Sequence, residues 1–363
     1  TDPDGGTTTH TYNAVGNLVR TEHPNGTVEI REYDGLNRLV YLENSGPSGI
    51  INSFRYTLDA AGNRTAVEEH NGRRVEYIYD DLDRLIKETI FESGVSVASR
   101  TIEYVYDEVG NRLSREDSGE GTTIYTYDNN DQLETETTDG ITTTYTYDDN
   151  GNTLSRTDAN EQVNYTWNAE NRLISADTDG DGSDDVVNTY DADGVRVAQT
   201  VNDEETRYLI DTNRPYAQVL EEYTDSGIVK VSYTHGNRLI SQARSNERSF
   251  YHVDGIGSIR ALTDATGDLT DSYLYDAFGQ VLTSTGSTQN SYLFTGEQKD
   301  FNLGLDYLRA RYIDVSSGRF VSRDSFEGLI SMPETLHRYS YVKNNPVNLT
   351  DPSGLFTLIS VSV

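Results

Sequence analysis

A Tyr-Asp pair returns repeatedly along this chain, and its recurrence constrains the fold more than any other feature. The sequence has seven copies and two variants with Asn at the second place: Tyr33-Asp34, Tyr79-Asp80, Tyr106-Asp107, Tyr127-Asp128, Tyr147-Asp148, Tyr190-Asp191 and Tyr275-Asp276, with Tyr12-Asn13 and Trp167-Asn168. Where the series is unbroken, successive pairs stand about 20 to 27 residues apart, a period typical of one repeated supersecondary unit.

Each repeat has the pattern of a β-hairpin. Residues 122–127 alternate β-branched and aromatic side chains with a period of two, as a strand does. Residues 148–152 supply the Asp, Asn and Gly of a tight turn, and Asp139-Gly140 supplies a second turn. Isolated hairpins are marginal in water, so we expect them to pair along one continuous sheet. The repeated tyrosines are expected to pack in it, with a sugar-binding aromatic platform as the alternative.

Composition excludes several classes of function. There are 60 acidic and 29 basic residues, a net charge of −31, which would repel nucleic acid and anionic membranes. There are no cysteines, so a disulfide, a zinc-thiolate site and a thiol nucleophile are all excluded. The most apolar stretch, residues 355–363, is too short to span a bilayer. The six histidines show no metal-binding spacing, and no glycine-rich phosphate loop precedes a helix, so we expect neither a nucleotide cofactor nor a turnover enzyme.

The Tyr-Asp pair, followed by a turn and an Asn-Arg-Leu-like segment, resembles the YD repeat of Rhs proteins, bacterial wall-associated proteins, insecticidal toxin-complex C subunits and the animal teneurins. This resemblance covers residues 8–295 or so. The later chain resembles the Rhs-associated core, whose elements it matches in order at residues 273–279, 294–298, 305–314, 317–324, 338–348 and 351–355.

The resemblance implies an all-β fold, in which a spiralling antiparallel hairpin ribbon forms a hollow shell or part of one. A C-terminal core segment would turn inward as a plug. It further implies three parts: YD repeats at residues 1–250, the core at 251–355, and the start of a variable region or a cleaved peptide at 356–363. We expect the chain to be a piece of a longer protein, because residues 1–6 show no start Met or signal peptide.

The implied function is an encapsulating scaffold. It would enclose or present a C-terminal effector, in cis or as another chain of the assembly, in delivery or competition between cells. The alternative is a structural or adhesive surface protein that encloses nothing and binds glycans or calcium. Either protein would be secreted or on the cell surface, through a signal outside this segment.

The resemblance also implies self-cleavage by an aspartyl-protease-like core. The catalytic carboxyls would be Asp324 and Asp351, and the bond between Leu355 and Phe356 would be cut. Two carboxyls held close together acquire different pKa values, so that one serves as base and the other as acid. Arg323 would stabilise the developing oxyanion. The alternative is purely structural, since residues 351–354 form a favourable Asp-Pro-Ser-Gly turn.

An acidic loop offers a calcium site. Residues 177–185 match the first nine positions of a calcium-binding loop, with candidate ligands Asp177, Asp179, Asp181, Ser183 and Asp185. The twelfth position is Asn188 rather than a bidentate Glu, and no flanking helix is expected. The alternative is an acidic, solvated hairpin tip.

Overall fold

The main body of the protein is a single antiparallel sheet of 26 strands. The structure, a computed structural model, describes residues 1–2, 5–245, 247–355 and 358–359. The strands of this sheet are β1 (Thr9–Tyr12), β2 (Leu18–Glu22), β3 (Val28–Tyr33), β4 (Leu39–Gly46), β5 (Gly49–Leu58), β6 (Arg64–Glu69), β7 (Arg74–Tyr79), β8 (Leu85–Phe91), β9 (Arg100–Tyr106), β10 (Arg112–Asp117), β11 (Gly121–Tyr127), β12 (Leu133–Thr138), β13 (Ile141–Tyr147), β14 (Thr153–Thr157), β15 (Gln162–Trp167), β16 (Leu173–Asp177), β17 (Val186–Tyr190), β18 (Arg196–Val201), β19 (Glu204–Asp211), β20 (Gln218–Thr224), β21 (Val229–His235), β22 (Leu239–Arg244), β23 (Glu247–Val253), β24 (Ile259–Thr263), β25 (Leu269–Tyr275) and β26 (Val281–Thr285).

The strands follow one another as an uninterrupted meander. Each pairs antiparallel with the strand before it and the strand after it, from β1–β2 to β25–β26. The pairing register shifts at the Tyr of the repeated pair, for example at Tyr33, Tyr79 and Tyr147. Such bulges bend the bulged strand and strengthen its twist. A bulge at each repeat therefore curls the ribbon in one direction.

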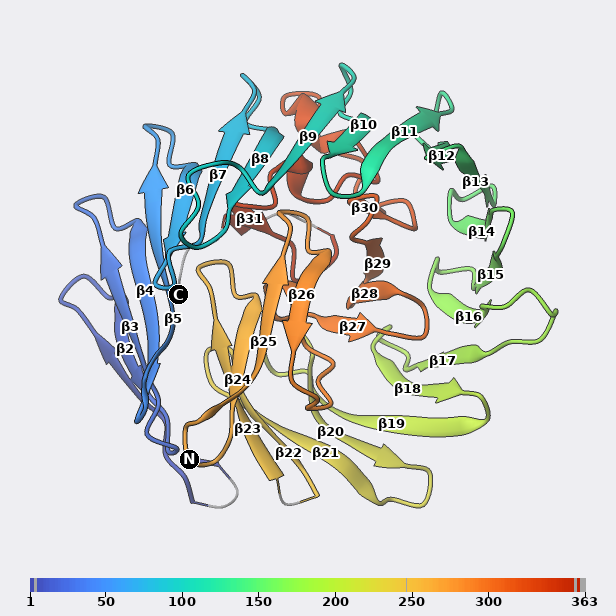
Figure 1. The fold of residues 1–363 in the computed structure, drawn as a ribbon. Coiled ribbons are helices and arrows are strands. Elements are labelled where there is room, and N and C mark those ends of the chain that lie inside the picture. Colours follow the sequence, from blue (N-terminus) through green and yellow to red (C-terminus); the bar gives the residue numbers. More distant parts are fainter. Residues whose placement is uncertain (3–4, 246, 356–357, 360–363) are drawn as a thin grey trace.

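The curled ribbon forms an open coil. Figure 1 shows the strands running round a ring, with the last strands passing inside it, and β24 contacts β5. At this seam Asn44 Nδ2 donates to the Val253 carbonyl at 3.0 Å, and the Gly255 amide donates to the Tyr56 hydroxyl at 2.8 Å. The expected spiralling hairpin ribbon is confirmed, and within the described residues its two end strands, β1 and β26, do not pair with each other.

Both side chains of the repeated Tyr-Asp pair make hydrogen bonds with the backbone. The aspartate accepts hydrogen bonds from the backbone of its own turn, as Asp34 does from the amides of Leu36 at 2.9 Å and Arg38 at 3.0 Å. The tyrosine hydroxyl donates to a carbonyl of the preceding repeat. These bonds are Tyr33 to Leu18, Tyr79 to Arg64, Tyr106 to Leu85, Tyr127 to Arg112, Tyr147 to Leu133, Tyr190 to Leu173 and Tyr275 to Ile259. The repeated tyrosines therefore join neighbouring hairpins as well as packing in the sheet.

The chain after β26 turns inward and occupies part of the interior of the coil as a plug. Its elements are η1 (Phe294–Gly296), β27 (Gln298–Asp300), β28 (Leu305–Leu308), β29 (Arg311–Asp314), β30 (Arg319–Phe320), η2 (Pro333–Thr335), η3 (Val342–Asn344), β31 (Leu349–Thr350) and β32 (Leu358–Ile359). Strands β27–β30 form a small sheet of their own inside the ring (Figure 1). The expected inward-turning plug is confirmed.

Apolar packing and a buried ion pair hold the plug to the ribbon. Tyr312 lies in one buried cluster with Tyr165 and Leu173 of the ribbon. Arg196 on β18 pairs with Asp300 on β27 at 3.1 Å, with both side chains almost fully buried. No helix among the described residues is long and apolar enough to cross a bilayer.

The bond between repeats gives a testable prediction. Replacing Tyr106 by Phe removes one hydroxyl and leaves the Leu85 carbonyl without that donor. We expect a loss of about 1 kcal/mol in the free energy of unfolding, measured by urea denaturation. Tyr12→Phe is the matched control, because Tyr12 is 48% exposed and its hydroxyl accepts a hydrogen bond from the exposed Asn237 side chain at 2.9 Å; its effect should stay within about 0.5 kcal/mol. Equal effects of the two substitutions would contradict this role of the hydroxyl.

Candidate functional site

The structure brings the two predicted catalytic aspartates to one arginine. Asp324 follows β30, Asp351 follows β31, and Arg311 lies on β29. The Arg311 Nη2 atom is 2.7 Å from Asp324 Oδ2 and 3.8 Å from Asp351 Oδ2. The guanidinium lies over the Phe320 ring, with its central carbon 3.6 Å from the ring centroid. The small sheet β27–β30 therefore supplies the cation that two carboxylates share.

Burial and charge oppose each other at this site. Burial lowers the pKa of Arg311 to about 10, although the carboxylates of Asp324 and Asp351 raise it. Burial raises the pKa of Asp324, although Arg311 lowers it. One cation faces two carboxylates, so a proton on one carboxyl would balance the charge. A carboxyl that holds its proton more tightly than usual is suited to act as a general acid.

A backbone segment of the plug positions Asp324. The Asp324 amide donates to the Arg338 carbonyl at 3.0 Å, and Arg338 Nη1 donates to the Asp324 carbonyl at 2.8 Å. Arg311 Nη1 donates to the same Arg338 carbonyl at 3.1 Å. The Phe326 amide donates to Asp324 Oδ1 at 2.8 Å. Residue 338 thus holds both the aspartate and the arginine.

The Asp-Pro-Ser-Gly turn fits closely against the β28–β29 hairpin. The Gly354 amide donates to the Asp351 carbonyl at 3.3 Å, which closes the turn. Arg311 Nε donates to the Gly354 carbonyl. Gly354 has a φ of +70°, and a Cβ there would collide with the Leu308 carbonyl oxygen. No other residue suits this place without displacing the hairpin.

Asp351 lies beside the bond predicted to be cut. Its Oδ1 accepts a hydrogen bond from the Leu355 amide at 3.2 Å and another from Ser353 Oγ at 2.9 Å. Phe356, on the other side of that bond, lies outside the described residues, as does most of the segment 356–363. The carboxylate of Asp351 is therefore held within one residue of the predicted cleavage point.

Arg323 lies elsewhere. Its side chain is exposed and lies against Gly151 in the turn between β13 and β14. The cation between the two aspartates belongs to Arg311, which the sequence analysis did not single out. The signal that could have found it is an arginine inside the core element at residues 305–314, because a charge that becomes buried needs a partner.

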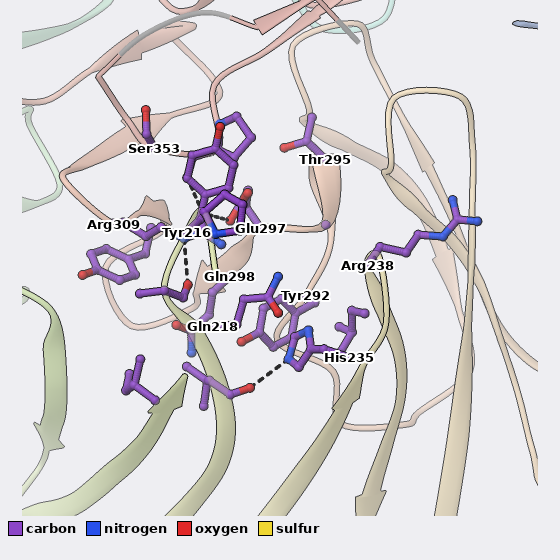
Figure 2. A pocket seen from close by; sticks show the side chains of 18 of the residues that line it. Tyr216, Gln218, His235, Arg238, Tyr292, Thr295, Glu297, Gln298, Arg309 and Ser353 are labelled. Carbon is purple, nitrogen blue, oxygen red and sulfur yellow. Dashed lines mark hydrogen bonds and ion pairs between the residues drawn. The ribbon is translucent and has the colours of Figure 1, made fainter. Parts of the chain in front are cut away.

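A cavity of about 510 Å³ lies between part of the plug and the ribbon. Figure 2 shows Gln218 and His235 on the ribbon side and Glu297, Gln298 and Arg309 on the plug side. Arg309 Nη1 donates to Glu297 Oε2 at 2.7 Å and to the Pro352 carbonyl, while Arg309 Nε donates to the Ala217 carbonyl at 2.9 Å. Arg309 therefore ties the turn that begins at Asp351 to the ribbon.

A second and more polar cavity, of about 480 Å³, adjoins the first. Arg196, Tyr208 and Gln298 line both cavities. The interior of the coil is therefore filled in part by the plug and hollow in part.

In the acidic loop, three of the five predicted calcium ligands come together. Carboxylate oxygens of Asp177, Asp179 and Asp185 lie within 4.8 Å of one another. The other two ligands, Asp181 and Ser183, bond each other, with the Ser183 amide donating to Asp181 Oδ1 at 2.8 Å. The spacing of the Asp177, Asp179 and Asp185 oxygens is one that a single cation could bridge.

Hydrogen bonds already stabilise two of these carboxylates. Asp185 Oδ2 accepts the amide and the hydroxyl of Thr178, both at 2.7 Å, and these bonds lower the pKa of Asp185. Burial raises the pKa of Asp177, but hydrogen bonds from Asn164 and from the Gly180 and Gly182 amides outweigh it, so the pKa is lowered. The carboxylates stay charged without a metal, and calcium binding remains a prediction.

Comparison with known proteins identifies the family of the chain. A family model described as Teneurin YD-shell matches residues 88–347, more than half of the chain, and an RHS Repeat model matches residues 53–92. The tRNA nuclease WapA of Bacillus subtilis (strain 168) is 32% identical over 206 residues, which cover 55% of this chain and 9% of WapA. The toxin subunit YenC1 of Yersinia entomophaga is 28% identical over 221 residues, 52% of this chain and 22% of YenC1.

A solved structure has the same fold. The crystal structure of TcdB2-TccC3 superposes with a TM-score of 0.50 at 20% identity, over 96% of this chain and 22% of that one. The present chain thus spans under a quarter of the length of these relatives. By its repeats, its coil and its plug, the chain belongs to the teneurin YD-shell family of Rhs-repeat proteins.

Proposed function

We propose that this chain is part of an encapsulating scaffold, which encloses or presents a C-terminal effector in delivery or competition between cells. The observation that carries the proposal is the inward course of the plug. Its last part docks on the ribbon from within: Arg64 on β6 donates to the Val347 carbonyl at 2.6 Å, and the Arg64 amide donates to Asn348 Oδ1 at 2.8 Å. A polypeptide joined to this plug would start inside the coil, beside the hollow space.

The relatives support a role with toxins. Besides the toxin subunit YenC1, the toxin protein Tse5 of Pseudomonas aeruginosa is 32% identical over 107 residues, which are 30% of this chain and 8% of Tse5. On this proposal the partner is an effector domain, in cis or in another chain of the same assembly. The scaffold would work outside the cell that makes it, as a secreted or surface protein.

We further propose that the core cuts its own chain after Leu355. Water would attack the Leu355 carbonyl carbon while Asp351 takes a proton from it. Asp324, whose pKa is raised, would give a proton to the Phe356 nitrogen as the C–N bond breaks. This leaves a carboxyl on Leu355 and an amine on Phe356. Arg311 fits the cationic role better than Arg323, because it contacts both aspartates and donates to the Gly354 carbonyl.

One relative favours the alternative function. Salivary gland surface protein 1 of Aedes aegypti is 28% identical over 172 residues, which are 46% of this chain and 5% of that protein. An adhesive surface protein of this kind would expose its ribbon to glycans and would not need to cut itself. Processing of the chain therefore separates the two proposals.

Self-cleavage is tested by intact mass spectrometry of residues 1–363 expressed as one chain. We expect the wild type to lose the segment from Phe356 to Val363, and Asp324→Asn or Asp351→Asn to keep it. Asp149→Asn, at an exposed turn, is the control and should be cut as the wild type is. An intact wild-type chain would refute self-cleavage and leave the surface-protein proposal standing.

Calcium binding by the acidic loop is tested by isothermal titration calorimetry. Because one divalent cation would relieve the repulsion among three carboxylates, we expect a Kd of about 10⁻⁴ to 10⁻³ M, as in extracellular modules. Asp179→Asn should abolish the binding heat, whereas Asp184→Asn, in the same loop but outside the group of three, should preserve it. Absence of a heat signal with the wild type would show that the loop is only a solvated tip.

A further inference from the structure

His337 lies at the contact between the plug and the ribbon, immediately before the residue that holds the aspartate site. Its Nδ1 atom accepts two backbone hydrogen bonds, from the Tyr339 amide at 3.2 Å and the Ser340 amide at 2.9 Å. Its Nε2 atom is 2.8 Å from Asn111 Oδ1 in the turn between β9 and β10. The imidazole therefore fastens residues 337–340 of the plug to a turn of the ribbon.

These bonds require a neutral ring with one particular tautomer. Since Nδ1 accepts two N–H groups, it carries no proton, and Nε2 carries the hydrogen that it donates to Asn111 Oδ1. Arg319 on β30 also donates to Asn111 Oδ1, at 3.0 Å, and lies 3.5 Å from the imidazole Nε2. A proton on Nδ1 would point at two donors and add a second positive charge beside Arg319.

The charged groups around the ring come from three elements. Arg319 on β30 faces the imidazole. On the ribbon, Asp107 and Asp131 bind the nitrogen of the Asn111 side-chain amide, whose oxygen faces the imidazole. Asn111 Nδ2 donates to Asp107 Oδ2 at 3.0 Å and to Asp131 Oδ1 at 2.8 Å. Burial, and then Arg319, lower the pKa of His337 to about 3. No carboxylate contacts the ring directly among the described residues, and a backbone hydrogen bond that raises the pKa of His337 does not offset burial and Arg319.

The segment that His337 fastens is the one that positions Asp324 and Arg311. The Arg338 carbonyl accepts hydrogen bonds from the Asp324 amide at 3.0 Å and from Arg311 Nη1 at 3.1 Å. Loss of the bonds to His337 would loosen residue 338 on one side and leave the segment bonded to the ribbon through Tyr339, whose hydroxyl donates to the Gly151 carbonyl at 2.8 Å. Both partners of the Asp324–Arg311 ion pair would lose a shared acceptor.

We propose that His337 is a positioning residue, which couples the aspartate site to the coiled ribbon only while its imidazole is neutral. This inference rests on the proposed self-cleavage, and it assigns a regulation to the same site. The plug would stay docked and competent near neutral pH. Acid would loosen the segment 337–340 and thereby uncouple the site from the ribbon.

The direction of the pH effect follows from linkage. A free histidine takes up its proton near pH 6.5, whereas the docked ring does so only near pH 3. Docking is therefore fully favoured above pH 6.5 and weakens as the pH falls from 6.5 toward 3, since the undocked state then binds a proton that the docked state excludes. The equilibrium for opening should increase by up to about tenfold per pH unit in this window.

The test compares wild type with His337→Asn, His337→Ala and His70→Asn in the full chain. In Asn, the side-chain oxygen can accept the two backbone N–H groups but does not titrate. His70, exposed at another turn, controls for removal of a histidine as such. Hydrogen exchange of the amides of Asp324, Tyr339 and Ser340 is followed between pH 7 and pH 4.5 and corrected for intrinsic exchange rates. The fraction of cut chain is measured by intact mass.

We expect opening to rise about tenfold per pH unit below 6.5 in wild type and His70→Asn, and to stay flat in His337→Asn. His337→Ala should be open at every pH and cut at least tenfold more slowly, and His337→Asn should restore cutting. The same pH dependence in His337→Asn as in wild type, or full cutting by His337→Ala, would overturn the proposal. If the wild type is never cut, self-cleavage fails, and the exchange data still decide whether His337 controls docking.

Discussion

The hydrogen bond from the tyrosine of one repeat to a backbone carbonyl of the repeat before it is the interaction on which the rest of the structure depends. Hairpins alone are marginal in water, and this chain has few large aliphatic side chains with which to build a core. The hydrogen bond from the Tyr147 hydroxyl to the Leu133 carbonyl, at 3.0 Å, is one example of this link between repeats. The bulge at the same tyrosine turns the ribbon, so one residue both joins and curls successive repeats.

The coil in turn makes the buried site possible. A plug with Arg311, Asp324 and Asp351 in its interior carries a charge imbalance that water would otherwise relieve. The surrounding ribbon positions the turn that begins at Asp351 through contacts such as that of Arg309 with the Ala217 carbonyl. Burial also shifts the pKa values in the direction that acid–base chemistry needs. Architecture and chemistry are therefore linked through the contact surface between ribbon and plug.

Sequence reasoning reached the repeat, the hairpins and the turn aspartates, because strand alternation and turn chemistry are local. The inward plug was implied by the resemblance to the Rhs-associated core. Sequence reasoning also named Asp324 and Asp351, which the structure brings to one guanidinium. It did not find Arg311 or His337, because their partners come from distant elements: Asn111 is more than two hundred residues from His337. The hydroxyl bonds of the repeated tyrosines were missed for the same reason, since their acceptors are backbone atoms that no residue pattern marks.

On our proposal, coil and plug together place two carboxylates on the guanidinium of Arg311 so that the chain can be cut. The most direct measurement is the intact mass of an Arg311→Lys chain, together with its near-ultraviolet circular dichroism. Lysine keeps the charge but lacks the planar fork that reaches Asp324, the Arg338 carbonyl and the Gly354 carbonyl together. We expect a chain with wild-type dichroism that stays uncut. Cutting at the wild-type rate would contradict the proposal.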